Sequence, residues 1–509
     1  MKDIKKLIKI SDRQMVNRPK LKANPTSKRN KQAQLYEILY YNELGNEDDI
    51  AQKLYGAKAS SSLNNYVKLK SRLRKKLLQS LFFLEPNNKT LKNSIDASRQ
   101  IYLGKILNAL RATDMSIKSL QKGMAAAVLG EHFDLANDAA NELMKIGYES
   151  NNMVVYQSAL KSIEEYESLS LLQAYVTRKF YEINLLVRNS AAKEKILRGI
   201  NTLIYFITSN IEKEQYFTFL LKYHQLLDLK YQLNHNNTAI LHNSLTAIEL
   251  LNEFDNIPEK DIFYFKFQYL KACKNLQQYK NGALYISTLS GFESKRLIDE
   301  NNVLMHQFSI LFSFGLESYL ETITKLDSLS KNKSFKSLNN KDKAIFKLYS
   351  TYAEIALCIN QNKNSSKDRF CDDVLNIKIE KLIDELKPLK DDKQGSNVSL
   401  IVLELLLAIL QNDFDLIHDK IDAIKTYRSR YLRLVEHKRV NLFLGLIINL
   451  EKKSFDINKL KPGDFSNYSD LKDNPEKLIS KIYEVIPFEK VWNLIVTALQ
   501  NANKFTKTV

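Results

Sequence analysis

The residues best suited to chemistry in this chain are cations and amides that recur every three or four positions near its N-terminus. Drawn on a helical wheel of residues 61–84, they gather on one face that is free of acids. The members of this face are Asn65, Lys68, Arg72, Lys75, Lys76 and Gln79. Cations of this kind neutralise phosphates, and Asn or Gln amides can bond to base edges. The face is therefore the candidate nucleic-acid-binding site.

Other interpretations of this basic face stay open. Lysine-rich helix faces are often only solvated, and the whole chain is rich in Lys and Asn. Docking onto an acidic protein is a second alternative, and binding of structured RNA, including ribosomal RNA, is a third. Acids are absent from residues 51–83, however, and that span holds eight Lys or Arg. Contact with several phosphates would make binding fall steeply with salt.

Catalytic and metal-binding patterns are missing from the sequence. The seven histidines are scattered, and a break at Asn236 and Asn237 is expected to separate His235 from His242. The acids of Asp413–Asp415 and Cys371–Asp373 stand at expected helix starts, where they complement the helix dipole. No nucleophile, phosphate-loop or dinucleotide motif occurs. We therefore expect no enzymatic activity, no catalytic residue, no cofactor and no metal site.

Three short helices are predicted to position the basic face. The first covers residues 31–42, and the second follows Asn46, has acids in its first turn and ends at Gly56. The third runs over residues 60–84, with an apolar side opposite the basic one. That apolar side consists of Tyr66, Leu69, Leu73, Leu77 and Leu81. Three helices ending in such a face describe a helix-turn-helix module.

The run Arg72–Leu77 (RLRKKL) resembles the end of the recognition helix in winged-helix response regulators, where a Leu-Arg-x-Lys-Leu run closes that helix. Lys68 and Lys70 replace residues that are apolar in that family. Glu85–Asn88 leads toward another helix instead of a clear β-wing. The resemblance implies a DNA-binding, helix-turn-helix-like module over residues 31–90. We expect residues 1–30, which precede it, to form a basic flexible arm.

Beyond Pro86 the chain is predicted to be all-α. It contains only 13 Gly and 8 Pro, and no proline lies between Pro86 and Pro258 or between Pro258 and Pro388. Long helices exclude proline from their interiors. Helices of about 12–22 residues, separated by short polar breaks, imply antiparallel neighbours. The predicted fold over residues 91–458 is a right-handed solenoid of antiparallel helical hairpins.

Parts of this solenoid resemble tetratricopeptide (TPR) repeats. Gly130, the aromatic Phe133 and then Ala136 follow the order found in that family. A second match surrounds Tyr279 and a looser one covers residues 412–415, while the first-helix Trp and closing Pro of the repeat are missing. The resemblance implies a TPR-like solenoid that binds a protein or peptide, although the sequence does not indicate which residues line its groove.

Charge divides the chain into a basic head and a nearly neutral body. Residues 1–100 hold 22 Lys or Arg against 9 Asp or Glu, a net charge of +13 out of +18 for the whole chain. This split indicates two roles, with the head meeting something anionic. The leading hypothesis is a non-enzymatic regulator whose solenoid binds a protein partner and whose head contacts nucleic acid. The alternative is a pure protein-interaction scaffold.

The remaining expectations concern location and the C-terminus. The strongest apolar run, Leu400–Leu410, is too short for a membrane span and is predicted to be a buried helix. Three cysteines without CxxC spacing and an N-terminus without a signal-peptide core suggest a cytoplasmic protein that contacts no membrane. Residues 459–509 are expected to form capping helices, with Trp492 packed on the core.

Overall fold

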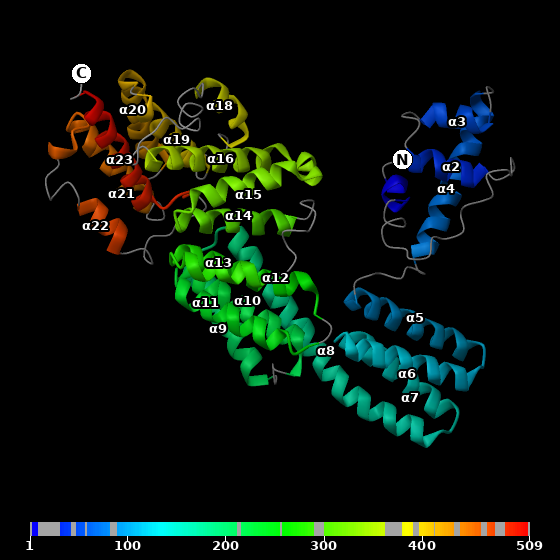
Figure 1. Ribbon diagram of the computed structural model, residues 1–509. Coiled ribbons are helices and arrows are strands. Elements are labelled where there is room, and N and C mark those ends of the chain that lie inside the picture. The colour runs from blue at the N-terminus through cyan, green and yellow to red at the C-terminus, as the bar shows by residue number, and fades with distance from the viewer. Residues whose placement is uncertain are drawn as a thin grey trace. The chain divides into compact units, whose positions relative to one another are not determined.

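A computed structural model of the chain describes residues 3–8, 31–41, 47–55, 59–81, 89–210, 215–254, 257–289, 300–361, 379–389, 396–411, 413–431, 438–459, 466–473 and 484–506 (Figure 1). Every regular element in these ranges is a helix, so the all-α prediction is confirmed. None of these helices is long and apolar enough to cross a membrane. Contacts divide the chain into two units, which are described separately below.

The first unit, residues 1–179 with the short segments 215–218 and 254–258, begins with a small basic module that we call the head. Its helices are a short one at residues 3–8, α2 (Lys31–Tyr41), α3 (Glu47–Tyr55) and α4 (Ala59–Leu81). The helix at 3–8 buries Ile4 and Ile8 in the core that these helices share. The rest of the predicted arm, from residue 9 to residue 30, lies outside the described residues.

Four further helices follow in the first unit: α5 (Lys89–Ala109), α6 (Thr113–Leu129), α7 (Phe133–Glu149) and α8 (Met153–Arg188). The last residues of α8 belong to the second unit. Glycines allow α5 and α6 to approach closely: a Cβ on Gly104 would lie 2.5 Å from the Leu120 side chain, and one on Gly123 2.7 Å from Ile101. The predicted helix lengths are wrong for α8, which runs for 36 residues because its sequence contains neither Gly nor Pro.

One type of turn joins successive helices repeatedly. In each such turn, one residue after the first helix has a left-handed backbone conformation. The N–H of the residue that follows it donates to the carbonyl five positions earlier in the chain, as from His132 to Ala127 at 2.8 Å. The left-handed residues are Arg111, Glu131, Asn151, Ser190, His235, Gln277 and Glu317, and none is the glycine that this conformation favours. Those at 235, 277 and 317 are 42 and 40 residues apart, wider than a TPR repeat of about 34 residues.

The second unit covers residues 180–214, 219–253 and 259–509. Its helices are α9 (Lys193–Asn210), α10 (Phe217–Leu233), α11 (Asn237–Leu251), α12 (Glu259–Asn275), α13 (Tyr279–Thr288), α14 (Glu300–Gly315), α15 (Tyr319–Lys331), α16 (Asn340–Gln361), α18 (Ile379–Glu385), α19 (Ser396–Leu410), α20 (Phe414–Tyr431), α21 (Lys438–Lys452), α22 (Ser466–Asp473) and α23 (Phe488–Thr506). Short 3₁₀ segments are η2 (Lys333–Ser337), η3 (Lys387–Leu389) and η5 (Ile457–Lys459). Successive helices pack on one another, as α11 on α12 and α19 on α20.

The last helix, α23, departs from this nearest-neighbour packing because it contacts α16 and α19 as well as α21 and α22. Its Trp492 is buried in the same cluster as Phe443, which confirms the predicted packing of the only tryptophan on the core. The apolar run Leu400–Leu410 lies within α19, where most of its side chains are buried, as predicted.

Candidate nucleic-acid interface

Helix α4 carries the predicted basic face, and contacts from α2 and α3 fix its position in the head. The Lys70 ammonium donates to the Glu47 carboxylate at 2.8 Å, and this bond holds the pKa of Glu47 below its usual value. The Tyr55 hydroxyl donates to the backbone carbonyl of Asn65 at 3.3 Å. The Lys31 ammonium lies 3.8 Å from the centroid of the Tyr55 ring. The first two contacts hold the N-terminal half of α4 against α3, and the third joins α2 to α3.

The apolar side of α4 is buried as predicted. Tyr66, Leu73 and Leu77 are fully buried in the core of the head, and Leu69 packs against the same core while partly exposed. Burial raises the pKa of the Tyr66 hydroxyl to about 12. The side chain of Leu81 lies outside the described residues. Because one side of α4 is committed to this core, its opposite side must face outward.

The predicted basic face is exposed along its whole length. All of its members have exposed side chains: Asn65, Lys68, Arg72, Lys75, Lys76 and Gln79. The face extends over about 21 Å, because a helix rises about 1.5 Å per residue. Within the described part of the chain, none of its four cations pairs with a carboxylate, whereas Lys70 on another side of α4 does. The arrangement can therefore present unneutralised charge and amide groups to an anionic ligand.

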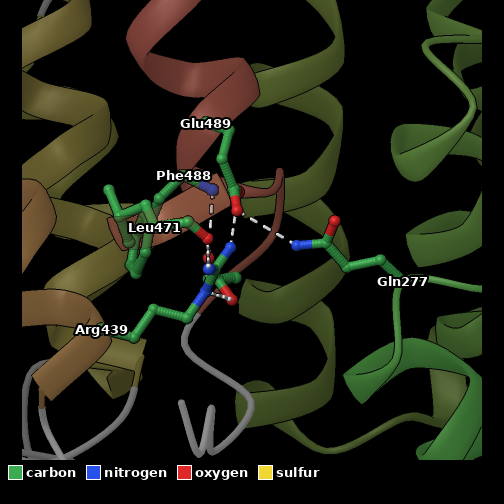
Figure 2. A network of polar contacts seen from close by, with 6 residues as sticks. Gln277, Arg439, Leu471, Phe488 and Glu489 are labelled. Carbon is green, nitrogen blue, oxygen red and sulfur yellow. Dashed lines mark hydrogen bonds and ion pairs between the residues drawn. The ribbon is translucent and has the colours of Figure 1, made fainter. Parts of the chain in front are cut away.

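A buried ion cluster in the second unit was not predicted from the sequence (Figure 2). Arg439, at the start of α21, is 3% exposed; its Nε donates to Glu484 at 2.9 Å and its Nη1 to the Leu471 carbonyl at 3.1 Å. Its Nη2 pairs with Glu489, which also accepts a bond from Gln277 at 3.1 Å. Although burial favours the neutral forms, the opposite charges raise the pKa of Arg439 and lower that of Glu484.

This cluster has a structural role, since it anchors the start of α23. Gln277 and Glu317 are the left-handed residues of the α12–α13 and α14–α15 turns. Gln277 bonds to Glu489 and Glu317 pairs with Lys490, so both turns hold the first turn of α23. Arg439 is shared by two carboxylates, those of Glu484 and Glu489, and the Lys274 ammonium also helps to lower the pKa of Glu484.

A second buried polar group joins α10 to α11. The Asn243 amide donates to Asp228 at 2.7 Å and to the His224 carbonyl at 3.1 Å, so its Oδ1 accepts the proton of His224 Nδ1 at 2.7 Å. Asp228 is fully buried, and its second oxygen has no hydrogen-bond partner among the described residues. Burial raises the pKa of Asp228 to about 7, against the opposing effects of Asn243 and Lys271.

The described residues bring no metal-ligand group together: no cluster of three or more His, Cys, Asp or Glu occurs among them. His235 lies in the predicted break before α11 and His242 on the exposed side of that helix. The Asp413 carboxylate accepts a bond from the Leu416 N–H at 3.0 Å, which is the predicted helix-start role. The segment with Cys371 lies outside the described residues.

No family model, no curated protein and no solved structure matches this chain.

Proposed function

We propose that this chain is a non-enzymatic interaction protein whose basic head contacts nucleic acid in a regulatory role, while its helical body binds a protein or peptide. The observation that carries the proposal is the exposed face of α4. Four cations and two amides share it without an acid, and the cations lack carboxylate partners among the described residues. Phosphates would supply the missing negative charge.

The arrangement of α3 and α4 supports a helix-turn-helix-like head. α3 ends at Tyr55 and α4 begins at Ala59, so three residues separate them, and the first of these is Gly56. Helix-turn-helix motifs join their two helices by turns of this length that often contain glycine. The second helix of such a motif is the one that contacts nucleic acid, and here it carries the basic face.

The recurrence of one turn type supports a TPR-like body, a right-handed solenoid of antiparallel hairpins. Residues 235, 277 and 317 occupy the same position in the α10–α11, α12–α13 and α14–α15 turns, which is every second turn of this part of the chain. Solenoids of this type present extended surfaces to peptides and proteins. We place the protein in the cytoplasm because its three cysteines lack CxxC spacing and do not form an even disulfide set, which fits a reducing compartment.

Two rivals make different predictions about the head. A pure scaffold would bind neither DNA nor RNA at physiological salt, and its basic face would be solvated surface. An RNA- or ribosome-associated factor would prefer structured RNA to duplex DNA in competition.

The test measures binding of the full chain to a fluorescent duplex DNA at several salt concentrations. Replacing Lys68, Arg72, Lys75 and Lys76 with Ala should abolish most binding and flatten its salt dependence. Arg72→Ala and Arg74→Ala form a matched pair, because both arginines are exposed on α4 but only Arg72 lies on the face. Unchanged binding by the fourfold variant, or equal losses in the matched pair, would refute the proposed face.

A further inference from the structure

Two contacts link Lys31, which is not part of the α4 face, to the N-terminal end of that face. Its ammonium lies 3.8 Å from the centroid of the Tyr55 ring. The hydroxyl of that ring donates to the carbonyl of Asn65, the residue at the N-terminal end of the face. A single aromatic side chain thus joins the start of α2 to the start of the basic face.

The charge of Lys31 stays available to a ligand. An aromatic ring attracts the ammonium through its electron-rich face but carries no net charge, so the cation is positioned without being neutralised. No carboxylate in the described residues pairs with Lys31, in contrast to Lys70, which is bound to Glu47. Lys31 is also partly buried, which restricts its side chain before any ligand arrives.

We infer that Lys31 contacts a backbone phosphate of the same nucleic acid that lies along α4, beyond the Asn65 end of the face. This inference rests on the proposed function. It adds a cation from a second helix, so the footprint becomes wider than the single line of side chains on α4. None of the six residues on that face is aromatic, and single-stranded nucleic acids are usually held by stacking on aromatic rings. The ligand class that fits is a duplex held through its phosphates.

The test uses the full chain and a 25-base-pair DNA duplex of mixed sequence, with binding followed by fluorescence anisotropy across a salt series. Lys31→Met keeps an apolar stem on the Tyr55 ring but removes the charge. It should weaken binding and reduce the slope of log K against log salt by about 0.9, the loss of one phosphate contact. Lys31→Arg should keep the wild-type slope. Arg74→Ala, which removes an exposed cation of the same head away from the face, is the control and should also keep it.

The outcomes separate this inference from the proposed function. A wild-type slope for Lys31→Met, with binding lost in the fourfold α4 variant, would overturn the role of Lys31 and leave the function standing. Unchanged binding in both variants would refute the function itself. Tighter binding of single-stranded DNA of the same length would overturn the assignment to a duplex. Thermal melts of each variant confirm that the head stays folded.

Discussion

Asp228→Asn is expected to remove a pH dependence of stability that this one buried carboxyl creates. Asp228 is fully buried, accepts one bond from the neutral Asn243 amide, and has a second oxygen without a partner among the described residues. Burial raises its pKa from 3.8 to about 7, so between these values the folded state holds a proton that the unfolded state has lost. Stability therefore falls as pH rises through this window.

The size of the effect follows from the width of the window. Each pH unit in which only the folded state is protonated costs about 1.4 kcal/mol. Between pH 5 and pH 8 the wild type should lose about 2–3 kcal/mol through Asp228. Asparagine has nearly the same shape and cannot titrate, so the variant should lack this loss.

The assay is urea unfolding at pH 5, 6, 7 and 8, followed by the fluorescence of Trp492. This is the only tryptophan, and it belongs to the same unit as Asp228. The difference in unfolding free energy between wild type and Asp228→Asn is plotted against pH, with Asp384→Asn on the exposed side of α18 as the control. Parallel curves for wild type and Asp228→Asn from pH 5 to 8 would refute the reasoning.

Three further predictions concern stability. Glu131→Ala removes the carboxylate that accepts hydrogen bonds from the Phe217 and Thr218 N–H groups, at 2.7 and 2.8 Å. It should lower the free energy of unfolding by about 2–3 kcal/mol and speed hydrogen exchange at those two amides. Glu131→Gln should lower it less. Arg439→Met leaves two buried carboxylates without their cation and should lower the free energy of unfolding by about 3–5 kcal/mol, measured by thermal unfolding. Replacing Glu484 and Glu489 with Gln in the same variant should remove most of this loss. Gly147→Ala puts a Cβ 2.7 Å from the Tyr156 backbone nitrogen and should cost about 1–3 kcal/mol; an equal cost for Gly199→Ala, where the nearest atom is 3.4 Å away, would contradict this reasoning.

The parts of the fold that depend on local pattern could be predicted from the sequence. The burial of Tyr66, Leu73 and Leu77 and the exposure of the opposite face of α4 follow from helical periodicity alone. The break after His235 follows from its polar neighbours. The 36-residue length of α8 was not predicted, because helices of about 12–22 residues were expected throughout the body.

Long-range polar contacts could not be predicted, because no spacing rule links their members. Arg439 pairs with carboxylates 45 and 50 residues away, and Gln277 bonds to Glu489 across 212 residues. The left-handed residues of the turns could not be predicted for a different reason. Charged or amide residues such as Glu131 and Gln277 occupy positions where glycine would have been the recognisable signal. Lys31 is similar, since only the folded head brings it onto the Tyr55 ring, whose hydroxyl bonds to Asn65.

The anchoring of α23 has a consequence for how the second unit unfolds. In a stack whose repeats contact only their neighbours, the ends fray first and the middle unfolds independently of them. Here the first turn of α23 is bonded to the α12–α13 and α14–α15 turns through Gln277 and Glu317. Opening the C-terminal helix therefore removes bonds from hairpins in the middle of the unit. Hydrogen exchange in α12 to α15 should report the release of a helix about 200 residues away.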